Sequence, residues 1–195
     1  MINNIIKKIS GFCGLLLPIV TTIILIVTLL KNQWFSWTKN AISDLGKANA
    51  SPLLFNNGLI ILGILLLIFS IELIISFKEK FGPTIIFMCS FLLMLIGVFP
   101  IPHMLHEPIS AIFFISFPVA FLIIGYTFYK DSFPSFIMGI KILALMVVVS
   151  VLFAFIFFFF YKWVAISEIL VFYPGFIWCM VYSINLLRND YGFRD

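Results

Sequence analysis

Long apolar runs, separated by short polar or proline-containing stretches, dominate the chain. Six of these runs are long enough to cross the hydrocarbon core of a bilayer as helices, which takes about 20 residues. We place the predicted spans at residues 13–30, 53–75, 84–101, 109–128, 136–160 and 164–187. The runs are continuously apolar, whereas the strands of a transmembrane β-barrel alternate. The pattern predicts an all-α, polytopic integral membrane protein with a bundle of six transmembrane helices.

The breaks between the spans have local causes. Charged residues and Gly82-Pro83 separate the second span from the third, and three prolines separate the third from the fourth. Residues 161–165 form the shortest break. Pro18, Pro118 and Pro174 lie inside spans, where we expect kinks that neighbouring helices accommodate.

Composition excludes a soluble globular protein. Of the 195 residues, 63% are hydrophobic and only 10% are charged, and the mean hydropathy is +1.21. Too few polar residues remain to coat a soluble core of this size. The length suits one domain. Cys13, Cys89 and Cys179 fall within or at the edge of spans, and we expect them to be buried apolar residues rather than a disulfide framework.

The distribution of lysine and arginine predicts the orientation. With the N-terminus inside, residues 1–12 and the tail 188–195 are cytoplasmic, and eight of the twelve basic residues lie on the cytoplasmic side. These eight are Lys7, Lys8, Lys78, Lys80, Lys130, Lys141, Arg188 and Arg194, against Lys31, Lys39, Lys47 and Lys162 outside. We therefore expect an N-in/C-in protein of the cell membrane. Its net charge of +4 indicates attraction to anionic membrane lipids and no nucleic-acid partner.

In this topology the polar residues gather on the outer face. The first outer loop, the start of the second span, the second outer loop and the start of the sixth span all contribute. The set comprises Ser43, Asp44, Asn56, Asn57, His103, His106, Glu107, Ser167 and Glu168. With Tyr173 of the sixth span, Asn56 and Asn57 are candidates for a lipid-binding or structural polar cluster. This asymmetry is the main functional signal in the sequence.

The segment PHMLHEP (residues 102–108) offers the sharpest local pattern. On a helical turn, His103, His106 and Glu107 would face one way at i, i+3 and i+4, which is a spacing that can hold a metal with a further carboxylate ligand. Acid–base chemistry is a second interpretation. The third is structural: an interfacial loop in which one histidine bonds a helix end.

Two acids fall inside spans. We expect Glu168 to face the bundle interior, paired with a histidine or Lys162, because an unpaired acid inside a membrane is costly. Glu72 lies near a cytoplasmic helix end, where its side chain can reach the head groups, and we assign it a structural role.

Several motifs in order resemble a known family. NAISDLG (residues 40–46), LFNNGLIILG (54–63), GVFP (97–100) with His106 beyond it, and ISEILVFYPGFIW (166–178) resemble the prokaryotic membrane family catalogued as domain of unknown function 998. The ISDLG element is also similar to the Frag1/DRAM/Sfk1 group of six-helix membrane proteins, some linked to lipid remodelling. The resemblance implies six helices and an outer polar cluster. Ile169 stands where that family's last helix would carry an arginine after the acid.

The ISD motif also has a plausible structural role. Ser43 can cap the turn, Asp44 favours a helix N-terminus, and Gly46 tolerates an unusual backbone angle. The motif would then fold the loop over the mouth of the bundle. In the alternative, Asp44 is a proton acceptor or ligand opposite His106.

Three functions from different classes follow. The first is lipid binding, or service as an accessory subunit with membrane-protein partners. The second is a lipid-headgroup hydrolase or transferase at the outer interface, with Asp44, His106 and Glu168 as the catalytic set and Ser43 as nucleophile. The third is a small transporter. No pattern identifies a cofactor.

Overall fold

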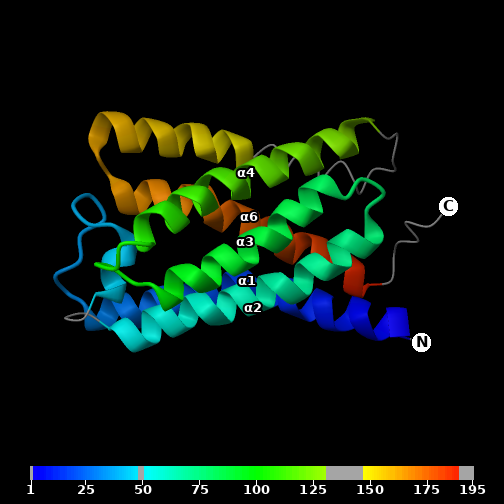
Figure 1. Ribbon diagram of the computed structural model, residues 1–195, viewed down its shortest axis with the longest axis horizontal. Helices are drawn as coiled ribbons and strands as arrows, with labels where there is room; N and C mark the ends of the chain where they lie inside the picture. The colour runs from blue at the N-terminus through cyan, green and yellow to red at the C-terminus, as the bar shows by residue number, and fades with distance from the viewer. Residues whose placement is uncertain (1, 48–50, 131–146, 189–195) are drawn as a thin grey trace.

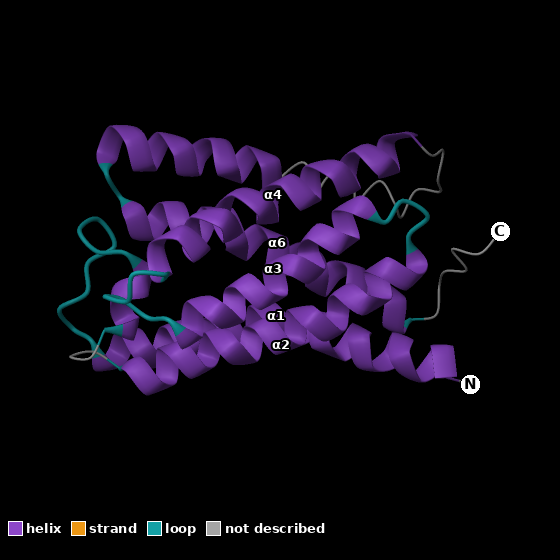
Figure 2. Cartoon of the chain, viewed as in Figure 1, coloured by secondary structure: helices purple, strands orange, loops and turns teal. Residues whose placement is uncertain are grey.

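The computed structural model describes residues 2–47, 51–130 and 147–188 of the chain (Figure 1). Helices are the regular structure of the described residues, and none of these residues forms a strand (Figure 2). The long helices are α1 (Ile2–Lys31), α2 (Pro52–Ser76), α3 (Phe81–Val98), α4 (His106–Lys130) and α6 (Val164–Leu187). A short 3-10 helix, η1 (Ile42–Gly46), precedes α2, and the apolar helix Val147–Tyr161 ends in a π-helical turn, η2 (Phe157–Tyr161).

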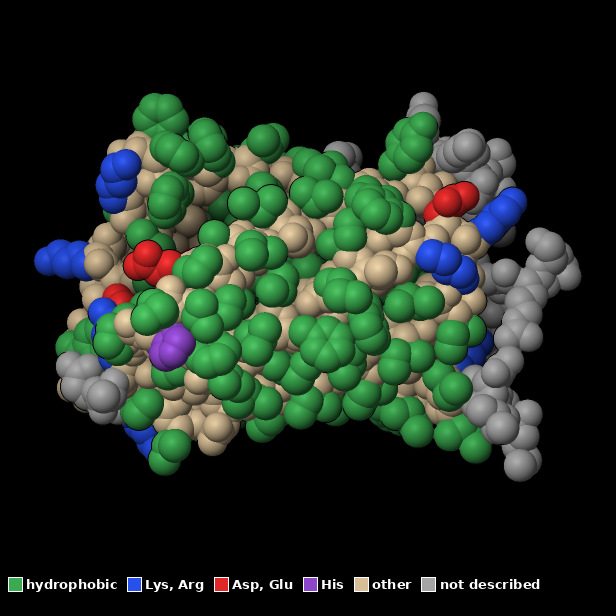
Figure 3. Space-filling view, viewed as in Figure 1, with side chains coloured by type: hydrophobic (Ala, Val, Ile, Leu, Met, Phe, Trp, Pro, Cys, Tyr) green, Lys and Arg blue, Asp and Glu red, His purple; other side chains and the backbone are tan. Residues whose placement is uncertain are grey.

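Five of the described helices are long and apolar enough to cross a membrane, namely α1, α2, α3, α4 and α6. On the face shown in Figure 3, apolar side chains cover the middle of the molecule and charged side chains lie towards the two ends. The structure thus supports a helical, multi-pass membrane protein. Residues 136–146, with Lys141, and the tail from 189 lie outside the described residues, so the count of six spans and the N-in/C-in orientation stay predictions.

The boundaries of α3 depart from the predicted span because proline was misinterpreted, whereas α1 extends the first predicted span to Ile2. The prediction began the third span at residue 84, but α3 begins at Phe81 and contains Pro83 in its first turn. Proline is tolerated there because the first N–H groups of a helix have no intrahelical partner. At the other end α3 stops at Val98, since Phe99 precedes Pro100 and is disfavoured in the helical region.

The five long helices form a closed ring. Helices α1 to α4 pack against one another in chain order, and α6 contacts both α4 and α1. We call the end that holds η1 the loop end and the opposite one the terminal end (Figure 1). At the terminal end Gly11 of α1 lies against Leu187 of α6. The starts of α2, α4 and α6 therefore share the loop end with the ends of α1 and α3.

The middle of the ring is filled by packed aromatic side chains. Phe113, Phe117 and Phe121 follow one face of α4, with ring centroids 5.3 and 5.1 Å apart. Phe121 meets Trp178 of α6 at 5.2 Å, and Trp178 stacks on Tyr182 at 5.3 Å. These five side chains are at most 2% exposed. The predicted burial of Cys13, Cys89 and Cys179 as free thiols is confirmed.

Helices α2 and α3 approach closely because glycines face the partner backbone. A Cβ on Gly63 would lie 2.8 Å from the Ser90 carbonyl oxygen and 2.3 Å from the Met94 side chain. A Cβ on Gly97 would lie 2.5 Å from the Asn56 carbonyl oxygen. Small residues at such contacts let helices in membranes come close enough for van der Waals packing to hold them.

Replacing Gly63 with leucine should separate α2 from α3. We expect Gly63→Leu to lower the free energy of unfolding by about 1–3 kcal/mol, the range found for overpacked interiors. The measurement is the thermal unfolding midpoint in detergent. Ile64→Leu is the matched control, because Ile64 is 44% exposed on the adjacent position. Equal midpoints for both variants would show that the close approach contributes little.

Candidate functional site

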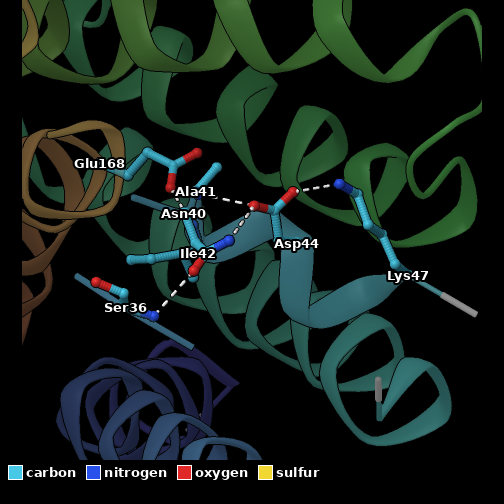
Figure 4. A network of polar contacts seen from close by, with 7 residues as sticks. All are labelled: Ser36, Asn40, Ala41, Ile42, Asp44, Lys47 and Glu168. Carbon is cyan, nitrogen blue, oxygen red and sulfur yellow. Dashed lines mark hydrogen bonds and ion pairs between the residues drawn. The ribbon is translucent and has the colours of Figure 1, made fainter. Parts of the chain in front are cut away.

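The 3-10 helix η1 is held across the loop end of the ring. The Ile42 N–H donates to Glu168 Oε2 of α6 at 2.5 Å (Figure 4). The Ala165 N–H, also of α6, donates to the Asn40 carbonyl oxygen at 3.1 Å. From α2, Asn56 Nδ2 donates to the Gly46 carbonyl oxygen at 3.1 Å. Side chains or backbone of two helices thus fix η1 at both of its ends.

Asp44 organises the turn that leads into η1. Its Oδ2 accepts the Ala41 N–H at 3.0 Å and Asn40 Nδ2 at 3.4 Å, and its Oδ1 pairs with Lys47 Nζ at 2.7 Å (Figure 4). Asn40 Oδ1 in turn accepts the Ser36 N–H at 2.9 Å. Burial by itself would raise the pKa of Asp44, but these hydrogen bonds and the Lys47 charge together hold its pKa below the ordinary value.

The ISD motif folds the loop, although two of its residues act differently from the prediction. Ser43 was expected to cap the turn, but Asp44 takes the backbone N–H, and in the described chain Ser43 makes no hydrogen bond. Gly46 does not have a positive φ. Glycine is required there for space, because an added Cβ would lie 2.3 Å from Asn56 Oδ1.

An apolar pocket lies at the loop end of the ring, with η1 as part of its wall. Its cavity volume is about 60 Å³, which is well below the roughly 300–1,000 Å³ usual for pockets that enclose a whole ligand, so it has room for only one end of a ligand. All five long helices contribute. The lining residues are Thr21, Ile24, Leu25, Ile42, Ser43, Phe55, Leu59, Leu62, Leu93, Ile96, Ser110, Phe113, Phe114, Glu168, Phe172 and Phe176.

Glu168 faces this pocket, as predicted, but without the predicted basic partner. Lys162 instead lies with its Nζ 5.9 Å from the centre of the Phe159 ring. Asp44–Lys47 is the one ion pair within the described residues. The Asp44 carboxylate is near enough to Glu168 to repel it. Among the described residues, Glu168 is therefore an acid without a basic partner in the wall of an apolar pocket, and its carboxylate accepts a hydrogen bond from the Ile42 backbone.

The two histidines lie apart from this pocket. His106, the first residue of α4, is buried, and its Nδ1 lies 2.9 Å from the Phe99 carbonyl oxygen at the end of α3. The structural interpretation of PHMLHEP expects this arrangement. His103 is exposed, precedes the helix and stacks on Phe99 at 4.7 Å. The Leu105 N–H donates to its Nδ1 at 3.2 Å.

The predicted metal and catalytic sets are not assembled. His103 and Glu107 are exposed while His106 is buried, because α4 begins only at His106 and the three side chains do not share a helix face. No group of three or more His, Cys, Asp or Glu side chains within the described ranges can hold a metal ion. His106, Asp44 and Glu168 each bond a different backbone group. The Ser43 hydroxyl group bonds no basic side chain, so the described residues contain no nucleophile–base pair at this site.

Asn56, Asn57 and Tyr173, which were expected to form one polar cluster, do not contact one another in a single cluster. Asn56 bonds η1, whereas Asn57 is exposed on α2. Tyr173 Oη lies 2.7 Å from Thr22 Oγ1, which joins α6 to α1. These residues therefore stabilise separate contacts.

Sequence reasoning missed Asn32 and Asn40, which shape the first loop. Asn32 is buried, and its Nδ2 donates to the Thr28 carbonyl oxygen at 2.8 Å and to Ser51 Oγ at 3.1 Å. Its Oδ1 accepts Trp34 Nε1 at 3.1 Å. The sequence signal for such a role is an asparagine that directly follows a predicted span and begins the loop leading to the next span.

Comparison with known proteins gives one match. The model of the family described as "Protein of unknown function (DUF998)" matches residues 13–185. No curated protein and no solved structure matches the chain.

Acid should loosen η1 through Asp44. Because its pKa is lower in the folded protein than the ordinary value, Asp44 stabilises the fold fully above pH 4–5, with an unfolded pKa of about 3.9. This contribution is lost as the pH falls through the folded pKa. Backbone hydrogen exchange of residues 40–47 should become faster as the pH falls through the folded pKa of Asp44. Asp44→Asn should remove this pH dependence. The control variant Glu79→Gln changes an exposed acid of the terminal end and should preserve it. An unchanged profile in Asp44→Asn would contradict the assignment.

Removing the Glu168 carboxylate should free the Ile42 amide. Ile42 is 5% exposed, and a buried N–H without an acceptor costs about 1–3 kcal/mol. We expect faster exchange of the Ile42 amide in Glu168→Ala. In Glu168→Gln the side-chain oxygen still accepts the bond, so protection should largely persist. Full protection of Ile42 in Glu168→Ala would show that another group holds η1.

Proposed function

The chain belongs to this family of proteins of unknown function, and we propose that it binds, inside the membrane, an amphiphile with an apolar tail and an amine head group. The proposal rests on one observation: an uncompensated carboxylate, Glu168, in the wall of an otherwise apolar pocket at the loop end. Membrane lipids are the partners that this chemistry fits best.

The pocket walls suit an acyl tail. Phe55, Leu62, Leu93, Phe113 and Phe176 line it with apolar surface from four helices. Burial of a hydrocarbon chain there is favourable in proportion to the apolar area covered. Each of the four helices supplying these residues is held in the ring by packing against its neighbours, so the walls are formed before a ligand arrives.

The carboxyl groups directly beside the pocket favour a cationic head group. Glu168 and Asp44 bring two carboxyl groups near each other, and Lys47 pairs only with Asp44. An ammonium group beside Glu168 would offset the charge of its carboxylate and donate a hydrogen bond to Oε1, because Oε2 already accepts the Ile42 N–H. An anionic head group would meet repulsion at the same place.

The finer topology belongs to the same proposal. We place the terminal end in the cytoplasm of a cell-membrane protein with six spans. Support comes from the contact between the start of α1 and the end of α6. The two ends of the membrane domain lie on the same side when the number of membrane crossings is even. The pocket and Glu168 would then open towards the outer leaflet, and an accessory role would be exercised from that side.

Binding can be measured with paired fluorescent amphiphiles in nanodiscs of neutral lipid. We expect a single-chain amine probe to bind roughly tenfold more tightly than its carboxylate counterpart, a difference of about 1.4 kcal/mol. Glu168→Gln should remove this preference, because it removes the charge, while the tail still binds.

A blocked pocket provides the second arm of the test. Ser110→Trp places an indole in the pocket and should weaken both probes. Ile112→Trp is the matched control, because Ile112 lies on the same helix and is 53% exposed. Unchanged binding in Ser110→Trp, or equal affinity of the wild-type protein for both probes, would contradict the proposal.

A further inference from the structure

A second acid, Glu72, is buried at the terminal end, away from the lipid pocket. The sequence predicted that its side chain would reach the head groups. Instead Glu72 is 5% exposed, and its Oε1 accepts a hydrogen bond of 2.5 Å from Ser76 Oγ one turn later on α2. The hydroxyl group solvates the carboxylate but leaves its charge uncompensated.

Lys80, in the turn that follows α2, is engaged elsewhere. Lys80 directs its Nζ at backbone carbonyl oxygens at the end of α2, those of Ile74 at 2.5 Å and of Phe77. The one ion pair within the described residues lies at the loop end. Lys78 and Glu79 of the same turn are exposed. Within the described chain no basic side chain therefore pairs with Glu72, and an isolated buried charge is strongly unfavourable.

Tyr182 of α6 brings another oxygen to the same place. Its side chain is 2% exposed and lies near enough to Glu72 and Ser76 to interact with both, yet no described residue meets its hydroxyl group with hydrogen-bond geometry. The ring is fixed between Trp178, at 5.3 Å, and Phe69, at 5.9 Å. Buried hydroxyl groups without a partner are rare, and an ion or a water accounts for many of them.

We infer that Glu72, Ser76 and Tyr182 bind a monovalent metal cation at the terminal end of the ring. The three side chains offer oxygen ligands, which hard cations prefer. One carboxylate balances one positive charge, so a monovalent ion leaves the site neutral and a divalent ion does not. A water molecule could complete the hydrogen bonds but would leave the charge of Glu72 buried.

The position of the site allows exchange with the aqueous phase. Glu72 lies in the last turns of α2, next to the exposed turn of Lys78 and Glu79. The packed aromatic side chains between α4 and α6 separate it from the pocket at the loop end. Cation binding is therefore independent of amphiphile binding, and either can fail alone.

Thermal unfolding in detergent tests the inference. We compare the midpoint of the wild-type protein in sodium chloride, potassium chloride and choline chloride at equal ionic strength. Sodium or potassium should raise the midpoint saturably above its value in choline, because a ligand that binds only the folded state stabilises it by mass action. Tyr182→Phe should weaken the apparent affinity about tenfold, since it removes one oxygen ligand.

Glu72→Gln separates cation binding from a folding role. This variant keeps an acceptor for Ser76 and carries no charge, so it should fold, unfold at a higher midpoint than the wild type in choline, and lose its response to the metal cations. Glu79→Gln and Glu168→Gln should retain that response. Equal wild-type midpoints in all three salts, a shift that follows pH alone, or a full cation response in Glu72→Gln would each overturn the inference.

Discussion

The hydrogen bond from the Ile42 N–H to Glu168 is the contact on which the loop end depends. Backbone groups beside hydrocarbon must find partners within the protein, and η1 is too short to satisfy its own first amides. Two carboxylates take consecutive N–H groups, Asp44 that of Ala41 and Glu168 that of Ile42. The same bond that positions η1 also leaves an acid beside the pocket, so one residue both holds the loop in place and adds a carboxyl group to the pocket wall.

The sequence predicted the helices far better than it predicted their polar partners. The predicted span 164–187 coincides with α6, and 53–75 differs from α2 by one residue at each end, because continuous apolarity is a direct signal of burial in lipid. Glu168 was correctly expected to face inward, but its partner is a backbone amide, which has no signature in residue type. The metal hypothesis assumed that His103, His106 and Glu107 lie on one helix. Because α4 starts at His106, His103 precedes the helix and the assumed spacing does not bring the three side chains together.

Each end of the ring holds one acid that pairs with no base among the described residues, and the surroundings distinguish the two. Glu168 lies beside open apolar volume, whereas Glu72 lies beside a hydroxyl group and a clamped phenol. A charged carboxylate in a low-dielectric interior is unfavourable unless a nearby group of opposite charge or a hydrogen-bond donor stabilises it. The two proposals therefore differ because the surroundings differ: an apolar cavity lies beside Glu168, and hydroxyl groups lie beside Glu72.

Closure of the ring by α6 has a consequence for biogenesis. Since α6 contacts both α1 and α4, the first and last described helices to be synthesised must meet, and a bundle of α1 to α4 has an open seam. Glu168 and Tyr182 both travel on the late helix. Neither set of contacts around Glu168 and Glu72 is complete in the nascent chain until α6 inserts. A chain stalled before α6 would expose the amides of η1 and would leave Glu72 without the cover of Tyr182. Membrane quality control would have these two features by which to distinguish unfinished molecules from complete ones.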